Sequence, residues 1–449
     1  MVVVDSLNKL DTGKLKCSRG TAVLLAAAAA LAVAHAAQAN PYRLTDLGPL
    51  TDLPGRSEAA VGGINNSGKV VASGTAEEAY AAMLYDGTWT NLGTLGGTES
   101  QGYGVNDSAQ VVGYSTIVDG LTRGFLWNPG GTDGVPGNPQ MKSIDTLGGP
   151  SSKAFAVNNN GQATGYAETD QNDYRAFCYS GGTISDIGAL LGNRLPNSYG
   201  YGINDAGHIV GEARDSQWTW NSRSAFFYDG AMAVTIGPLP GGQYASALAL
   251  NNADQVVGYS ETVGGVEHAF AYAGGVMSDL GTLGGNNSYA HAINHHGVIV
   301  GLAGIDPFND DLNHAFVYAD GKMADLNTLL DAGGTGWILV QASDINDAGQ
   351  IVGTGTYEGV KHGFLLNPVP PSLQPPTITT VEVEDTHVLI SFTTQEAAQY
   401  AVDFSDTLTS GSWDAVVTGV AGTGGVMTIT NSDAAAVPTR FYRVRLTPP

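Results

Sequence analysis

Residues 201–211, YGINDAGHIVG, are one of seven copies of a segment that recurs along the chain, and this repeated segment decides the fold. In each copy, small residues precede an aliphatic residue and an Asn. After the turn come an aliphatic residue, a variable residue and then Gly or Ala. The seven asparagines are Asn65, Asn106, Asn158, Asn204, Asn251, Asn294 and Asn346. Their spacings of 41 to 52 residues suit a four-stranded propeller blade, for which about 40 to 50 residues is typical.

Four strands are predicted in each repeat. The first runs into the Asn, and a tight Asn-Asp-x-Gly or Asn-Asn-x-Gly turn follows, because Asn, Asp and Gly tolerate the positive φ of hairpin turns. The Val-Val-Gly segment is the second strand. A short aromatic segment such as residues 269–272, AFAY, is the third, and a segment such as residues 278–283, SDLGTL, is the fourth. The alternating pattern between turn residues predicts an all-β domain.

The two ends of the repeat region complement each other. A fourth-strand segment at residues 44–50 precedes the first repeat, whereas the seventh repeat stops after its third strand at residues 362–366. The sequence therefore predicts a seven-bladed β-propeller at residues 40–367, closed by the N-terminal strand, which removes an exposed sheet edge. An open solenoid or β-helix is the alternative, but it would not explain this offset.

Small residues recur two and four positions before the repeat Asn. Innermost strands converge on the axis of a propeller, where small side chains let neighbouring blades approach. The excess of glycine, 62 of 449 residues, is thus largely architectural. Asp344 breaks this pattern in the last repeat.

The N-terminus is predicted to be a secretory signal peptide at residues 1–39. Basic residues precede an apolar run at residues 21–34, and Ala-Gln-Ala at 37–39 fits a cleavage site. A membrane anchor is the alternative, but this run is shorter than the ~20 residues that span a bilayer. We therefore expect a secreted, extracellular or periplasmic protein with no membrane span after cleavage. Cys178 is then the only cysteine, predicted to be a small buried hydrophobic residue.

The net charge of the chain restricts the classes of partner that it can bind. The chain has 42 Asp and Glu against 19 Lys and Arg, a formal net charge of -23. Nucleic acid is excluded as a partner, because phosphate binding needs a surplus of basic residues. Cations and cationic surfaces remain compatible with the charge.

A second domain is predicted after the repeats. Residues 368–376 are a stiff Pro-rich linker. Six strand-like runs follow within residues 377–449, which suits a small immunoglobulin or fibronectin-like β-sandwich. Residues 399–406 and 440–444 are similar to C-terminal modules of large secreted proteins of environmental bacteria.

The repeats also resemble a known family. His268-Ala269-Phe270 and His314-Ala315-Phe316, each followed by an Asp-Leu-x-x-Leu strand, look like the bacterial extracellular repeat family named for its His-Ala-Phe tripeptide. The resemblance covers residues 42–366 and implies a secreted protein with this fold, but no defined catalytic activity. In four other repeats the tripeptide is altered, and its first residue is Arg123, Arg175, Ser224 or His362.

Candidate ligand residues lie in the loops between second and third strands, at residues 168–175, 212–224 and 305–313, which are longer and more varied than the turns. Trp218 and Trp220 alternate with Thr219, so both indoles would lie on one side of an extended segment. Together with Arg214 they are candidates for binding sugar rings. The alternative is that the two indoles pack between blades.

Asp306, Asn309, Asp310 and Asp311 offer oxygen ligands of the kind that Ca²⁺ prefers. Their spacing does not match an EF-hand, and a solvated acidic loop is the alternative, so we expect either no cofactor or a calcium ion.

Other polar residues are explained by the repeat. His295 and His296 occupy a turn, and the histidines of the tripeptide share a position with Arg and Ser, so neither set indicates a metal or a catalytic site. The sequence contains no G-x-S-x-G, H-E-x-x-H or P-loop motif.

These observations predict a secreted, non-enzymatic binding or surface-interaction protein. Its ligand, a glycan, an ion or a protein, would lie on the loop face of the propeller, with polysaccharide or a cell-surface protein as the partner. An extracellular polysaccharide hydrolase or lyase is one alternative, since fold alone does not decide function. A structural surface protein is the other.

Overall fold

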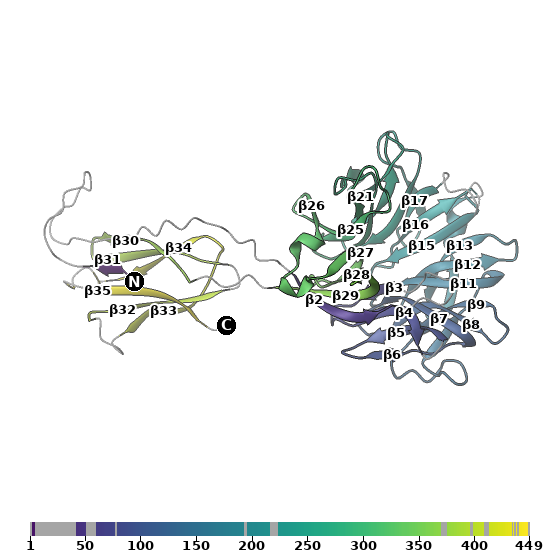
Figure 1. Ribbon diagram of the computed structural model, residues 1–449, viewed down its shortest axis with the longest axis horizontal. Helices are drawn as coiled ribbons and strands as arrows, with labels where there is room; N and C mark the ends of the chain where they lie inside the picture. Colours follow the sequence, from purple (N-terminus) through teal and green to yellow (C-terminus); the bar gives the residue numbers. More distant parts are fainter. Residues whose placement is uncertain are drawn as a thin grey trace. The chain divides into compact units, whose positions relative to one another are not determined.

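The computed structural model describes residues 2–4, 42–50, 60–76, 79–192, 195–215, 223–369, 375–395, 398–407, 413–432, 434, 437 and 440–447. These residues form an all-β protein (Figure 1). The chain divides into two compact units. One comprises Asn40–Val369, and the other comprises Pro370–Pro449 together with Met1–Ala39.

The first unit contains seven four-stranded antiparallel sheets among its described residues, and in six of them the strands follow one another along the chain. The first three sheets are β3 (Ala60–Ile64), β4 (Val70–Ala76), β5 (Ala79–Tyr85) and β6 (Trp89–Asn91); β7 (Gly96–Val105), β8 (Val111–Ile117), β9 (Thr122–Trp127) and β10 (Met141–Ile144); and β11 (Gly148–Val157), β12 (Ala163–Thr169), β13 (Tyr174–Ser180) and β14 (Thr183–Asp186). The next three are β15 (Asn197–Ile203), β16 (Ile209–Arg214), β17 (Arg223–Tyr228) and β18 (Ala233–Ile236); β19 (Ala245–Leu250), β20 (Val256–Glu261), β21 (Glu267–Ala273) and β22 (Val276–Asp279); and β23 (Ser288–Ile293), β24 (Ile299–Gly304), β25 (Asn313–Ala319) and β26 (Lys322–Asp325).

The last sheet joins the two ends of this unit. It contains β27 (Trp337–Ile345), β28 (Ile351–Tyr357), β29 (Val360–Pro368) and, as its outer strand, β2 (Tyr42–Pro49). β2 is antiparallel to β29, with Tyr42 opposite Pro368 and Pro49 opposite His362. This is the pairing that the unmatched strand at residues 44–50 predicts.

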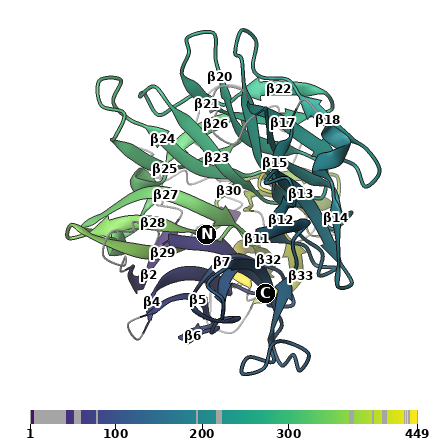
Figure 2. The same ribbon diagram turned by 90° about the vertical axis from the view of Figure 1, so that its right-hand side faces the viewer.

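The sheets are arranged radially in a propeller-like array (Figure 2), and the repeat asparagines link each sheet to the next. The Nδ2 group of each Asn donates a hydrogen bond to the backbone carbonyl of the repeat Asn in the following sheet, over 2.8 to 3.2 Å. The last of these bonds, from Asn346 to the carbonyl of Asn65, closes the circuit. All seven side chains are buried. We call these seven residues the asparagine circuit.

Each circuit Asn also shapes its own turn. The Oδ1 atom of Asn158 accepts hydrogen bonds from the backbone N–H groups of Asn160, at 3.1 Å, and Gln162, at 2.9 Å. One side chain therefore fixes a turn and joins two sheets, which explains why the same residue type recurs at this position.

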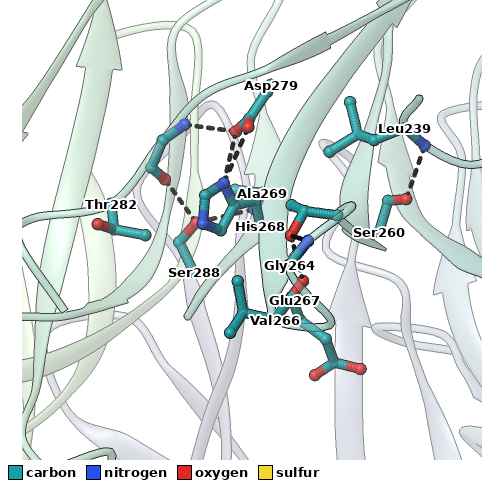
Figure 3. Close-up of polar contacts among 12 residues, drawn as sticks. Leu239, Ser260, Gly264, Val266, Glu267, His268, Ala269, Asp279, Thr282 and Ser288 are labelled. Carbon is teal, nitrogen blue, oxygen red and sulfur yellow. Dashed lines mark hydrogen bonds and ion pairs between the residues drawn. The ribbon is translucent and has the colours of Figure 1, made fainter. Parts of the chain in front are cut away.

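Buried serines make a second set of links between sheets. Ser288 of β23 accepts a hydrogen bond from the backbone N–H of Ala269 in the preceding sheet, at 2.8 Å (Figure 3). Ser100, Ser152 and Ser198 have the same position in their strands and bind Ala82, Gly124 and Ala176 in the same way. All four serines are fully buried.

The aromatic residue of the repeated tripeptide lies in the core between sheets. The fully buried members are Phe125, Phe177, Phe226, Phe270, Phe316 and Phe364. Small residues allow this packing: a Cβ atom added at Gly211 would lie 2.8 Å from Cε1 of Phe226.

Asp344 occupies a position where other repeats have Gly or Ala, and it bridges the last sheet to the first. Its Oδ2 atom accepts a hydrogen bond from the backbone N–H of Ile64, at 2.9 Å, and its Oδ1 atom accepts one from Ile345, at 2.8 Å. Burial raises the pKa of Asp344 to about 6, although these two bonds act in the opposite direction.

The second unit contains two sheets with a common core. One is formed by β30 (Ile378–Glu384), β31 (His387–Thr393) and β34 (Val426–Asn431), and the other by β1 (Val2–Val4), β35 (Arg440–Thr447), β32 (Gln399–Ser405) and β33 (Asp414–Ala421). Ile390 and Phe392 of the first sheet pack in one apolar cluster with Tyr400, Val402 and Tyr442 of the second. Apart from β1, residues 1–39 lie outside the described residues, as do residues 370–374 of the Pro-rich segment.

The described ranges contain no helix with the length and apolar character needed to cross a bilayer.

Removal of one circuit amide is expected to destabilise the first unit. Asn158→Ala should lower the free energy of unfolding by about 2–3 kcal/mol, because it leaves buried backbone groups of two sheets without partners. Urea unfolding checks this value. Asn159→Ala, in the same turn but exposed, is the matched control and should cost less than about 1 kcal/mol. Equal losses would contradict the role of the circuit.

Asp344 gives a pH dependence of known sign. Because its pKa in the folded protein, about 6, exceeds its ordinary value, the folded state takes up a proton between about pH 4 and pH 6 that the unfolded chain does not. This residue therefore adds stability as the pH falls from 7 to 4. The Tm of the wild type, measured relative to Asp344→Asn, should rise by a few degrees over that range. A difference in Tm that stays constant with pH would refute this assignment.

Candidate functional site

A pocket lies on the axis of the first unit, at the turns that follow the repeat asparagines. It has a volume of about 220 Å³ and is lined by the asparagine circuit, by the aliphatic residue before each Asn and by the residue after it. The residues after it are Asn66, Asp107, Asn159, Asp205, Asn252, His295 and Asp347. The sequence instead predicts the ligand on the face of the longer loops.

The polar groups at the rim of this axial pocket bind mainly to one another. Asp107 accepts hydrogen bonds from the backbone N–H and the Nδ2 group of Asn66, at 2.9 and 3.2 Å, and from Nδ2 of Asn159, at 3.0 Å. Asn159 also donates to Asp205, at 3.3 Å. The carboxylates are thus occupied by amide donors, and the rim serves the packing of the turns.

A second group of polar and aromatic side chains lies where strands lead into the loops, away from the Asn turns. We call it the tyrosine–arginine cluster, and it comprises Tyr166, Tyr174, Tyr199, Tyr201, Glu212, Arg214, Arg223, Tyr244, Tyr259, Glu267 and Tyr289. All seven tyrosines are half-buried. Arg214, Arg223 and Glu212 are buried among them.

One half of the cluster is organised around Arg214. Its guanidinium carbon lies 5.2 Å from the ring centre of Tyr199, and its NH2 group is paired with Glu212. The hydroxyl of Tyr201 donates to Oε1 of Glu212 over 3.1 Å. The ring of Tyr199 also lies 5.4 Å from that of Tyr166, centre to centre. Aromatic faces and one ion pair thus form a continuous group.

The other half is organised around Arg223 at the start of β17. Its guanidinium carbon lies 4.5 Å from the ring centre of Tyr244 and 5.1 Å from that of Tyr259. NH1 donates to the hydroxyl of Tyr259 at 2.7 Å, and NH2 to Oε1 of Glu267 at 2.6 Å. The hydroxyl of Tyr289 donates to Oε2 of Glu267 at 2.6 Å. Three sheets therefore contribute to one network.

The electrostatics keep the phenols neutral and the arginine charged. Burial, to which the charge of Glu212 adds, raises the pKa of Tyr259 to about 12, and burial raises the pKa of Tyr199 to about 12. Burial alone would lower the pKa of Arg223, but Tyr259, Glu267 and Glu212 raise it overall. At neutral pH the cluster thus presents hydroxyl donors, guanidinium donors and carboxylate acceptors together.

The structure describes one of the three predicted ligand residues on the loop after β16. Arg214 lies in the tyrosine–arginine cluster, with 7% of its surface exposed. Trp218 and Trp220 lie outside the described residues.

The acidic loop between β24 and β25 directs its oxygens to neighbouring groups. Asp306 accepts the backbone N–H of Phe308 at 2.9 Å, and Asn309 accepts that of Asp311 at 3.1 Å. Asp310 accepts Nδ2 of Asn286 at 2.9 Å. In the portion of the chain with described positions, no three His, Cys, Asp or Glu side chains are grouped so as to hold a metal ion.

The recurrent histidines pair with the recurrent aspartates. The Nδ1 atoms of three tripeptide histidines lie 2.7 to 2.9 Å from a carboxylate on the adjacent outer strand, in the pairs His268–Asp279, His314–Asp325 and His362–Asp46. Ser288 lies beside the first pair in Figure 3. Its hydroxyl, however, donates to the carbonyl of Gly281 at 2.6 Å and is fully buried. Ser288 therefore links two sheets, whereas His268 and Asp279 pair neighbouring strands within one sheet.

His291 and Cys178 are two further titratable residues of the first unit, and both are half-buried. His291 lies with Nδ1 2.8 Å from the carbonyl of Ala342, and burial lowers its pKa. Cys178 is a free, half-buried thiol whose pKa is raised by burial, which does not favour a nucleophile.

Sequence reasoning missed the glutamates and tyrosines of the cluster. A signal was present: Glu212 follows the second-strand Gly at the position that other repeats fill with Tyr114, Tyr166 and Tyr259. A charged residue at a position where three other repeats have Tyr indicates a role outside the repeat itself.

Comparisons with known proteins leave the function open. No protein-family model and no curated protein sequence matches the chain. A puromycin-hydrolysing peptidase of Mycobacterium tuberculosis is 13% identical, with a TM-score of 0.45, over 79% of this chain and 58% of its own. The β-propeller domain of the Trilobed protease from Pyrococcus furiosus is 12% identical, with a TM-score of 0.33, over 79% and 90%. SapL1 lectin, in complex with alpha methyl fucoside, is 14% identical, with a TM-score of 0.34, over 71% and 98%.

This chain thus spans less than two thirds of the length of the peptidase. None of these likenesses indicates a ligand or a reaction for this protein.

Loss of one carboxylate from the cluster is expected to be costly. Glu267→Gln should lower the free energy of unfolding by about 2 kcal/mol, because it leaves the charge of Arg223 poorly compensated at a site where the arginine side chain is 6% exposed. Chemical denaturation measures the change. Arg43→Gln removes an exposed ion pair with Asp331 and is the control, expected to cost less than about 0.5 kcal/mol. A Glu267→Gln variant as stable as the wild type would show that the pair is not buried in solution.

Proposed function

We propose that residues 40–367 form a closed seven-bladed propeller of the His-Ala-Phe repeat type. The seven sheets, the pairing of β2 with β29 and the asparagine circuit support this architecture. Residues 377–449 would then be an immunoglobulin or fibronectin-like sandwich, which the common core of the two C-terminal sheets supports. Residues 1–39 would be a signal peptide that directs the protein out of the cytoplasm, and its cleavage would remove β1 from the edge of the second C-terminal sheet.

We further propose that this secreted protein binds a glycan, without turnover, at the tyrosine–arginine cluster. The observation that carries the proposal is the network around Arg223, where two tyrosine faces lie beside guanidinium, carboxylate and phenol groups. Sugar rings are recognised by this combination, because their C–H faces stack on aromatic rings and their hydroxyls need both donors and acceptors. Trp218 and Trp220, which the sequence predicts as sugar-binding residues, are proposed as further contacts for the same ligand.

The pairing of the carboxylates favours binding over hydrolysis. Glu212 and Glu267 are each paired with a guanidinium group. Most glycosidases use two carboxyl groups that flank the scissile bond, one as general acid and the other as base or nucleophile, whereas both glutamates here are engaged by arginine side chains of the network. Glu267, whose side chain is 18% exposed, is the acceptor for ligand hydroxyls in this proposal, whereas the buried Glu212 positions Arg214 and Tyr201.

Affinity electrophoresis of the purified protein through gels containing neutral polysaccharides tests binding. We expect retardation by at least one of them, and a loss of affinity of about tenfold in Tyr244→Ala, because one stacking contact contributes about 1 kcal/mol or more. Tyr272→Ala, which changes a half-buried tyrosine outside the cluster, should migrate like the wild type. Release of reducing ends or unsaturated sugars would support a hydrolase or lyase instead, and absence of retardation in every gel would support a structural surface protein.

A further inference from the structure

The solvent face of the second sheet of the C-terminal unit carries two neighbouring arginines. Along β35, Tyr442 and the partly buried Val444 pack into the apolar core, so the alternating residues Arg443 and Arg445 lie on the other face. Their side chains are 41% and 46% exposed. This arrangement is unusual in a chain with only 19 basic residues and a net charge of -23.

One buried carboxylate holds both arginines. The Oδ2 atom of Asp403 on β32 accepts Nε–H of Arg443 at 2.8 Å and Nε–H of Arg445 at 2.9 Å. The side chain of Asp403 is only 4% exposed. Burial would raise its pKa, but the hydrogen bonds and charges of the two guanidiniums lower it overall, so the carboxylate is ionised at neutral pH. Two positive charges are thus opposed by one negative charge.

The remaining donors of the two arginines point away from this anchor. Each guanidinium uses Nε for Asp403, and within the described part of the chain neither terminal amino group has a hydrogen-bond partner. The Arg443 guanidinium carbon also lies 4.5 Å from the ring centre of Trp413, which restricts its rotation further. Two guanidinium groups are therefore held side by side before any ligand arrives.

Arg440, on the same strand, provides the internal contrast. Its Nε and NH2 atoms donate to Oδ1 and Oδ2 of Asp406, at 2.6 and 3.0 Å, and its guanidinium lies 4.1 Å from the ring centre of Phe404. This arginine has a carboxylate of its own. The local excess of positive charge is therefore confined to Arg443 and Arg445.

We propose that Arg443 and Arg445, positioned by Asp403, form an oxyanion-binding site for the sulfate esters of an acidic polysaccharide. Guanidinium groups bind oxyanions through paired N–H donors, and the fixed orientation reduces the side-chain entropy lost on binding. Because the rest of the protein is acidic, a polyanion is repelled elsewhere and binds only where positive charge is concentrated. The open face of a sheet gives a polymer access. This site is independent of the glycan site proposed for the first unit.

Affinity electrophoresis of the full chain through gels with dextran sulfate, compared with unsubstituted dextran, tests the proposal. The wild type should be retarded by dextran sulfate alone, and inorganic sulfate should compete. Arg443→Gln and Arg445→Gln should each weaken binding by at least about fivefold, since each removes one fork. Arg440→Gln is the matched control and should bind like the wild type.

Each single variant leaves Asp403 paired with the other arginine, so the fold is expected to persist, and thermal unfolding checks this. Where a glutamine variant unfolds, the lysine variant at that position replaces it and should still bind less tightly, because it keeps the charge and loses the fork. Wild-type affinity in both Arg443 and Arg445 variants, an equal loss in Arg440→Gln, or equal retardation by unsubstituted dextran would overturn the proposal. Binding to phosphatidylglycerol vesicles without binding to dextran sulfate would overturn the polysaccharide as the ligand.

Discussion

The asparagine circuit is the constraint on which the first unit depends. A buried amide that loses water must find a protein partner, and each circuit Asn finds it in the next sheet rather than in its own. An open row of such sheets would leave a donor without an acceptor at one end and an acceptor without a donor at the other. The bond from Asn346 to Asn65 removes both defects at once. All donors and acceptors of the circuit are therefore paired only in a closed arrangement with a fixed number of sheets.

The same repetition makes the exceptions informative. Serines between sheets, phenylalanines in the core and histidine–aspartate pairs on the outer strands each recur in several sheets, because these sheets have the same packing needs. Glu212, Glu267, Arg214 and Arg223 do not recur in this way, and they gather on neighbouring sheets. Residues that the repeat does not need for packing can bind a ligand, and such residues are concentrated in the tyrosine–arginine cluster.

Much of the fold could be predicted from the sequence because it depends on local pattern. The spacing of the asparagines predicts the sheets, and the unmatched strand at residues 44–50 predicts its pairing with the end of the unit. The candidate site was harder to predict from the sequence. Arg223 and Tyr289 come from different sheets and meet only through Glu267, so their relation depends on three-dimensional register rather than on spacing. The axial pocket was missed because short turns, taken singly, have no concavity; the hollow arises when seven of them surround an axis.

The pairing of β2 with β29 also has a mechanical consequence. The chain enters the first unit at Tyr42 and leaves it at Pro368, and these two residues face each other at the end of one antiparallel pair. Tension applied through both ends therefore acts across the strands and separates their hydrogen bonds one after another, as in a zipper, instead of shearing them all together. Stretching would open this sheet at low force while the other six stay intact. A protein anchored at one end and pulled at the other would extend in a step and close again when the tension ends.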